Sequence, residues 1–161
     1  SLADPLTPNK GDNVRTDTLN PKNIVMNTKN IIRTFIHETF NLGNIGVINK
    51  LVHPHYRYTS PSDEINGPAE LADFVSALRE AFPNLVVTIV DQVSEEENSC
   101  TRINIKGTQA GPFLDIPPTG KSVNVDGVVF TRFKDGLIEE EWELLDQYTF
   151  LSQLGVIKNL G

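Results

Sequence analysis

Cysteine is almost absent from this chain of 161 residues, which contains only Cys100. A single cysteine excludes an internal disulfide framework and a thiolate metal cluster, so no cysteine cross-link within the chain stabilises the fold. Long apolar runs are missing too, since none approaches the roughly 20 residues of a membrane-spanning helix, and no signal-peptide core stands near the start. We expect a soluble, cytoplasmic protein without a membrane partner; removal of an export signal before Ser1 is the alternative.

Positive charge is scarce and scattered. The chain has 14 Lys and Arg against 21 Asp and Glu, which gives a formal net charge of -7 at pH 7. Nucleic-acid binding draws much of its affinity from clustered basic side chains, so we expect no nucleic-acid partner. His53 and His55 lack a third ligand at recognisable spacing, and we predict no metal site. The hydrophobic content of 39% suits one domain with a core.

The first residues differ in composition from the rest. Residues 1–21 are rich in proline and small polar residues and poor in apolar side chains, so burial cannot offset the entropy of ordering them. We predict a flexible N-terminal tail over residues 1–21 and a single domain over residues 22–161.

Helical spacing dominates the first half of that domain. A first helix is predicted to begin between Pro21 and Thr28 and to end near Gly43. A short helix over "IGVINKLV" is ended by Pro54, "YRYTS" is short and extended at best, and "AELADFVSALREAF" forms a third helix.

Alternating patterns follow and predict four strands and a closing helix. The strands are expected over residues 85–94, 100–109, 121–133 and 137–146, and the closing helix over 149–155. The "KDG" between the last two strands is a strong hairpin signal. Three helices followed by antiparallel strands indicate an α+β fold with the helices on one face of a curved sheet.

The last strand carries the candidate catalytic residue. With a strict period of two, Trp142, Leu144 and Asp146 share an apolar face, while the neighbouring glutamates face water. Desolvation there would raise the pKa of Asp146 and suit it to acid/base work. The alternative is that Asp146 caps the closing helix, because Asp is a favoured N-cap residue.

Gln109 is a second candidate. It follows Ile103 and Ile105 in phase and so would enter the same interior. The flanking residues Gly107 and Gly111 are equally consistent with a loop.

The stretch "GTQAGPFLDIPPTGKSVNVDGVVFTRFKDGLIEEEWELLDQYTFLSQLG" resembles the SnoaL-like polyketide cyclases, also described as ester cyclases, within the nuclear transport factor two-like superfamily. The matching elements are the "IPPTGK" turn, the R-F-x-D-G hairpin, the spacing from Trp142 to Asp146 and the terminal "QLG". The likeness extends loosely back to about residue 29. It implies an α+β cone (a cystatin-like α+β barrel), in which three N-terminal helices and the sheet enclose one deep apolar pocket, and it suggests a homodimer.

Characterised members of this family close the last ring of aromatic polyketides by an intramolecular aldol reaction without metal or organic cofactor. The aspartate of their Trp-x-x-x-Asp pattern, matched here by Asp146, is the proposed general acid and base. The resemblance therefore implies cofactor-independent aldol cyclisation or isomerisation of a small hydrophobic carbonyl compound. Gln109 or Tyr58 would donate a hydrogen bond to the developing oxyanion. The expected substrate-binding residues are Gln109, Trp142, Tyr58, Thr59, Phe130 and Leu144.

Two positions depart from the family pattern, because Gln109 and Thr59 stand where the family usually or often carries histidine. Both keep hydrogen bonding but do not titrate near neutrality. The alternative function is a non-catalytic scaffold for ligand binding or dimerisation. A buried Asp146 beside a second polar group would favour catalysis, and an Asp146 turned toward the amide of Tyr148 would favour the scaffold.

Overall fold

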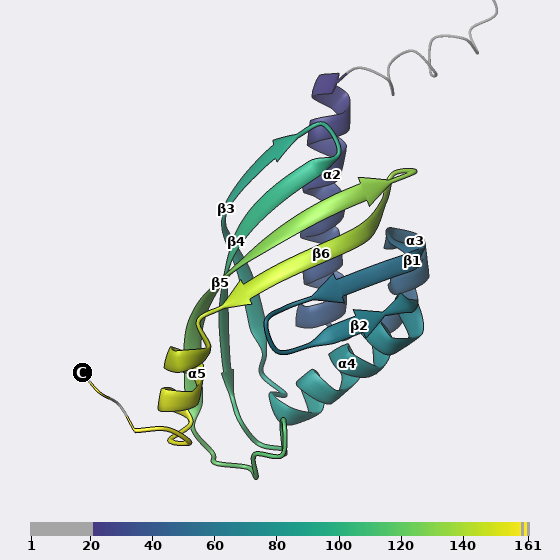
Figure 1. The fold of residues 1–161 in the computed structure, drawn as a ribbon. Coiled ribbons are helices and arrows are strands. Elements are labelled where there is room, and N and C mark those ends of the chain that lie inside the picture. The colour runs from purple at the N-terminus through teal and green to yellow at the C-terminus, as the bar shows by residue number, and fades with distance from the viewer. Residues whose placement is uncertain (1–20, 159, 161) are drawn as a thin grey trace, which may run out of the picture.

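The computed structural model describes residues 21–158 and residue 160 (Figure 1). The predicted tail over residues 1–21 lies outside this range except for Pro21, the first residue of helix α2. No helix in the described part of the chain is long and apolar enough to cross a membrane.

The helices lie close to the predicted positions. Helix α2 (Pro21–Phe35) continues into a π-helical turn, η1 (Ile36–Asn41), and Gly43 at φ +71° follows it, a conformation that glycine adopts without strain. The remaining helices are η2 (Ile45–Val47), α3 (Ile48–Leu51), α4 (Gly67–Ala81) and α5 (Gln147–Gln153).

The sheet has six strands in the order β2-β1-β6-β5-β4-β3. Their bounds are β1 (Val52–Thr59), β2 (Glu64–Asn66), β3 (Val86–Glu95), β4 (Asn98–Thr108), β5 (Ser122–Lys134) and β6 (Leu137–Leu145). All neighbours are antiparallel except β1 and β6, which are parallel. The predicted α+β class with a curved, mainly antiparallel sheet is confirmed, although β1 is longer than "YRYTS" suggested.

Strand β1 accommodates Pro54 because of a local irregularity. The pairing of β1 with β6 shifts register between Val52 and Arg57, and Pro54 lies inside this interval. Proline is tolerated in sheets at such bulges, where its missing N–H breaks no ladder. The proline therefore ends the helix, as predicted, without ending the strand.

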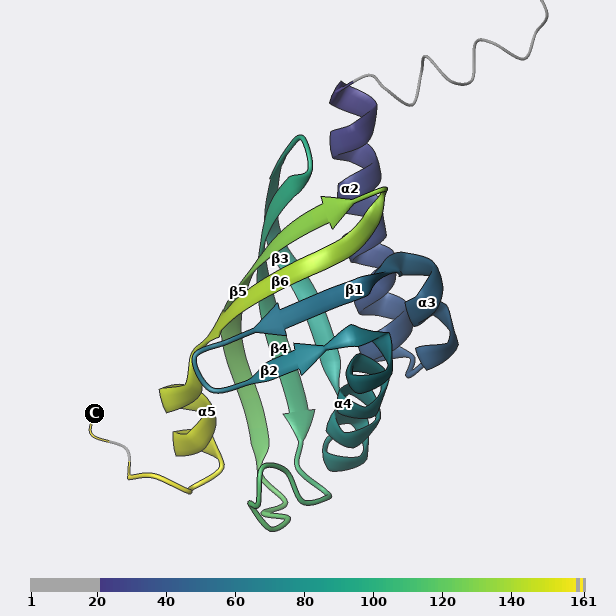
Figure 2. The same ribbon diagram turned by 45° about the vertical axis from the view of Figure 1, so that its right-hand side comes forward.

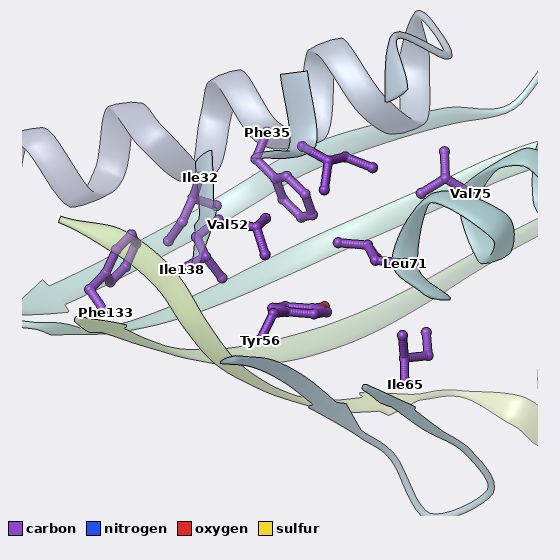
Figure 3. Close-up of a cluster of buried hydrophobic side chains, with 10 residues drawn as sticks. Ile32, Phe35, Val52, Tyr56, Ile65, Leu71, Val75, Phe133 and Ile138 are labelled. Atoms are coloured by element: carbon purple, nitrogen blue, oxygen red, sulfur yellow. The ribbon is translucent and has the colours of Figure 1, made fainter. Parts of the chain in front are cut away.

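The sheet curves but does not close into a barrel. Strands β2 and β3 are its two edges, and helices α2 and α4 lie along its inner side (Figures 1 and 2). Figure 3 shows part of the core between these layers, with Ile32 and Phe35 from α2, Leu71 and Val75 from α4, and Tyr56 from β1. A second buried cluster, which includes Phe82, Val125 and Phe150, lies toward α5.

A bulge in β6 decides which of its side chains point inward. Phe133 of β5 pairs with Ile138 and Arg132 pairs with Glu140, so Glu139 is an extra residue without a partner. One inserted residue exchanges the two faces of a strand beyond it, because side chains alternate with a period of two. After Ile138, the inward positions are therefore Glu141, Glu143 and Leu145, and the outward positions are Glu140, Trp142 and Leu144.

Candidate functional site

A cavity of about 330 Å³ lies between the inner face of the sheet and the helices. Its wall is mostly aliphatic and aromatic, with contributions from α2, α4, α5 and every strand. The exposed lining residues mark its opening: Ser62, Asp63, Leu114 and Gln147. The apolar lining residues include Phe35, Phe40, Phe74, Phe82, Phe113 and Phe150.

Two tyrosine–glutamate pairs interrupt this apolar wall. The hydroxyl of Tyr56 donates a hydrogen bond of 2.8 Å to Glu141 Oε1, and the hydroxyl of Tyr58 donates one of 2.8 Å to Glu143 Oε1. All four side chains line the cavity. The pairs form because β1 runs parallel to β6 as its direct neighbour, so alternate inward side chains of the two strands meet.

Burial shifts the pKa of both carboxyl groups. It raises the pKa of Glu141 from 4.5 to about 7; the Tyr56 hydrogen bond opposes this rise, and the negative charge of Glu143 adds to it. Burial likewise raises the pKa of Glu143, against the hydrogen bond from Tyr58. The pKa values of both tyrosines rise, chiefly through burial, so these hydroxyls remain protonated donors.

The charge balance of the cavity is one-sided. Its described lining residues include the acidic side chains of Glu141, Glu143 and Asp63, but no Lys, Arg or His. Within the described residues, no group of three His, Cys, Asp or Glu side chains is placed to hold a metal ion. The available chemistry of this wall is proton transfer and hydrogen bonding by carboxyl and hydroxyl groups.

Asp146 is not in this cavity. It is the exposed N-cap of α5, where its Oδ1 accepts a hydrogen bond of 3.1 Å from Thr149 N and its Oδ2 one of 2.6 Å from Thr149 Oγ1. These bonds lower its pKa. The prediction of a desolvated Asp146 with a raised pKa is wrong, and the capping alternative is confirmed. A catalytic role for Asp146 is not tested by this geometry and stays a prediction.

Three apolar or aromatic residues predicted to bind substrate lie on the outer face of the sheet. Trp142 is 45% exposed, Leu144 51% and Phe130 38%. Trp142 and Leu144 were placed inside on a strict period of two, which the bulge at Glu139 reverses. Phe130 is directly opposite Trp142 in the ladder and therefore shares its face. Thr59 of β1 is paired with Trp142 of β6 and does not line the cavity.

The remaining two predicted residues have different positions. Tyr58 lines the cavity, as expected, and its role in binding stays a prediction. Gln109 is fully buried but lies outside the cavity wall, in the loop after β4. Its side chain donates to Ile116 O at 3.1 Å and accepts from Thr119 N at 3.2 Å and Thr119 Oγ1 at 2.7 Å. It holds the loop that carries Phe113 and Leu114.

Sequence reasoning missed Glu141, Glu143 and Tyr56. The run "EEEWE" reads as a solvated face because glutamate is rarely buried without a partner. The available signal was the aromatic alternation of Tyr56 and Tyr58 in "YRYTS", which indicates a strand with one tyrosine-bearing face. Nothing in the local sequence pairs those tyrosines with the glutamates.

An open, curved sheet with helices over an apolar cavity defines the ketosteroid isomerase-like type of α+β fold. The profile of the SnoaL-like polyketide cyclases matches residues 30–154, and the chain belongs to this family. This placement is consistent with the nuclear transport factor two-like superfamily. A comparison with curated proteins found no match.

Solved structures agree with this placement. A candidate SnoaL-like polyketide cyclase from Jannaschia sp. CCS1 is 24% identical, with 83% of this chain and 95% of that chain covered and a TM-score of 0.77. IdmH, a candidate polyketide cyclase from Streptomyces antibioticus, is 26% identical, with 79% and 97% covered and a TM-score of 0.68. A protein of ketosteroid isomerase-like fold from Catenulispora acidiphila DSM 44928 is 13% identical, with 78% and 92% covered and a TM-score of 0.66.

Proposed function

We propose that this protein is a polyketide cyclase-type enzyme that performs cofactor-independent acid/base chemistry on a small hydrophobic carbonyl compound in the cavity. The reaction is an aldol cyclisation or an isomerisation. Membership of the SnoaL-like family supports a cyclase-type function in general. The observation that carries the specific chemistry is the pair of tyrosine-bound carboxyl groups inside an apolar cavity.

The two carboxyl groups take different roles because their charges interact. The negative charge of Glu143 raises the pKa of Glu141, which reaches about 7. Because the charge of Glu143 acts on Glu141, Glu143 is the first of the two to ionise and Glu141 keeps its proton longer, and such a split separates an acid from a base. Glu143 is the general base, and Glu141 is the hydrogen-bond donor to the carbonyl oxygen.

The proton balance of the reaction is simple. Glu143 removes a proton from the carbon next to the carbonyl, and the resulting enolate oxygen is stabilised by the Glu141 carboxyl group. In a cyclisation, the enolate carbon attacks a second carbonyl group, and the alkoxide receives the proton held by Glu143. In an isomerisation, that proton returns to a different carbon.

Proton exchange tests this function without knowledge of the product. The protein is incubated in deuterium oxide with a panel of bicyclic and tricyclic ketones that includes α-tetralone, and loss of the α-proton signals is followed by NMR. Exchange should exceed that of buffer. Glu143→Gln should lower it by about a hundredfold or more, the usual contribution of a positioned base.

Two variants serve as comparisons. Glu140→Gln changes an exposed carboxyl group on the outer face of the same strand and should leave exchange unchanged. Asp146→Asn tests the assignment made from the sequence. If Asp146→Asn abolishes exchange and Glu143→Gln does not, Asp146 is the base and the assignment of Glu143 is wrong.

The alternative is a non-catalytic scaffold of the same fold that binds a small ligand. The outward position of Asp146, bound to Thr149, is the observation that favours it. Tight binding of ketones with no exchange above buffer across the panel would support this alternative.

A further inference from the structure

Thr131 contributes a buried hydroxyl group without a hydrogen-bond partner to the cavity wall. The residue is 1% exposed and lines the cavity. Of the buried side-chain atoms that the structure describes, Thr131 Oγ1 and Ser152 Oγ lack a hydrogen-bond partner, and of these two residues only Thr131 is in the cavity wall. Buried polar groups are nearly always paired, so an orphaned hydroxyl in a ligand-sized cavity calls for a function.

Neighbouring hydroxyl groups on the inner face are already paired within the protein. Ser99, which pairs with Thr131 in the β4–β5 ladder, has its Oγ 2.6 Å from Ser94 Oγ. Thr101 Oγ1 accepts a hydrogen bond of 3.3 Å from Gln92 Nε2. The unpaired state is therefore specific to Thr131 among these positions.

Thr131 lies next to the acid of the proposed reaction. It is directly opposite Glu141 in the β5–β6 ladder, a position that brings Cβ atoms to about 5 Å of each other. The Tyr56 hydroxyl is already committed to Glu141 and the Tyr58 hydroxyl to Glu143. Besides the Thr101 hydroxyl, whose oxygen is engaged as an acceptor, the donors for a ligand in this part of the wall are the Thr131 hydroxyl, which has no partner, and a protonated Glu141.

We propose that Thr131 contacts the substrate and that its hydroxyl, together with the Glu141 carboxyl group, binds the carbonyl oxygen of an apolar ketone. A carbonyl oxygen has two lone pairs and can accept both hydrogen bonds. The ketone then enters oxygen first, and its apolar body lies toward Phe113 and Phe150. This inference rests on the proposed function for the class of ligand, but it concerns binding rather than turnover.

Affinity for a matched pair of ligands tests it. α-Tetralone and tetralin differ by the carbonyl oxygen, and their dissociation constants are measured for the wild type, Thr131→Val and Thr131→Ser. The wild type should bind the ketone more tightly than the hydrocarbon. Thr131→Val should weaken ketone binding by about tenfold, the size of one hydrogen bond, and leave tetralin binding unchanged. Thr131→Ser should restore the preference.

Thermal stability separates this role from a structural one. Thr131→Val removes an unpaired hydroxyl and should not lower Tm, whereas Ser99→Ala removes the partner of Ser94 and should lower Tm while leaving the ketone preference intact. Equal effects of Thr131→Val on both ligands, or no effect on either, would overturn the proposal. Tighter wild-type binding of the ammonium analogue α-aminotetralin than of the ketone would overturn it as well.

Failure here differs from failure of the proposed function. A ketone preference that depends on Thr131, in a protein that catalyses no exchange, leaves the subsite standing and removes the acid/base chemistry. Conversely, if exchange depends on Glu143 but Thr131→Val keeps the ketone preference, the acid/base chemistry stands and the Thr131 subsite is removed.

Discussion

The hydroxyl of Tyr58 on β1 donates a hydrogen bond of 2.8 Å to Glu143 Oε1 on β6, across 85 positions of sequence. Burial raises the pKa of Glu143, and this bond opposes the rise. The pair therefore holds an ionisable carboxyl group in an apolar wall without a neighbouring cation. Tyr58 is a positioning residue for the proposed base, and its removal should change the pH dependence of the reaction.

Tyr58→Phe should move the pH–rate profile of ketone proton exchange to higher pH. The variant loses the hydrogen bond that lowers the pKa of Glu143, so this pKa rises and ionisation of the base requires a higher pH. Profiles of the wild type and variant are compared by NMR. Tyr148→Phe, at an exposed tyrosine outside the cavity wall, is the control. An unshifted profile would show that Tyr58 does not tune the base.

Glu141 should make the protein less stable at higher pH. Its folded-state pKa is about 7 against an ordinary value of 4.5, so the unfolded carboxyl group ionises first as pH rises. The contribution of Glu141 to the free energy of unfolding is therefore fully present below pH 4.5. It is lost as the pH rises to about 7, by an amount on the order of 3 kcal/mol. Glu141→Gln should remove this loss, as measured by denaturant unfolding across that range.

Glu140→Gln is the matched control for this experiment, because Glu140 is exposed on the opposite face of β6. It should leave the pH dependence of unfolding unchanged. Equal pH dependence in the wild type and Glu141→Gln would mean that Glu141 is solvated in the folded protein.

Asp146 should act on stability as a helix cap. Asp146→Ala removes the two carboxylate oxygens that accept hydrogen bonds from Thr149, so it should lower Tm by a few degrees. Asp146→Asn keeps a favoured N-cap residue and should change Tm little. Since the capping bonds lower the pKa of Asp146, its contribution should persist above the ordinary aspartate pKa and fade on acidification. Equal Tm values for the wild type and Asp146→Ala would contradict the capping role.

Gln109→Leu should destabilise the protein and loosen the cavity wall. It takes one of two hydrogen bonds from the Ile116 carbonyl, which still accepts from Phe113 N, and it leaves two Thr119 donors without their acceptor, at a cost of about 2 kcal/mol. Ligand affinity should fall as well, because the loop carries Phe113 and Leu114 of the wall. Gln153→Leu, whose hydrogen bonds to Asn124 are exposed, is the comparison. Similar unfolding free energies for the two variants would contradict this role.

The outer face of the sheet should form a homodimer interface, as the family resemblance suggests. Its exposed apolar residues cross several strands: Val93, Val128, Phe130, Trp142 and Leu144. Apolar patches of this kind mark interaction sites. Sedimentation at micromolar concentration should show a dimer, and Trp142→Lys should dissociate it. Leu42→Lys, at an exposed leucine near the helices, should not. A wild-type monomer would refute the interface.

Much of the fold was determined by local sequence alone. The apolar spacing of α4 and the alternation of β5 are strong enough to predict these elements without their neighbours. The turn between β5 and β6 is equally local: Asp135 and Gly136 both have positive φ, as an Asp-Gly hairpin turn requires. The "IPPTGK" turn, the R-F-x-D-G hairpin and the terminal "QLG" pointed to the family that residues 30–154 confirm.

The composition of the cavity wall was decided only by tertiary structure. Three consecutive glutamates, Glu139 to Glu141, offer no local difference that tells which of them is inserted, so a strict period of two turned Trp142 inward and the glutamates out. Pairing with β5 places the bulge at Glu139 and reverses both faces. Pairing with β1, far away in sequence, then gives the buried Glu141 and the partly buried Glu143 their tyrosine partners. Such partners are what make burial of a carboxyl group tolerable, and a linear pattern does not contain them.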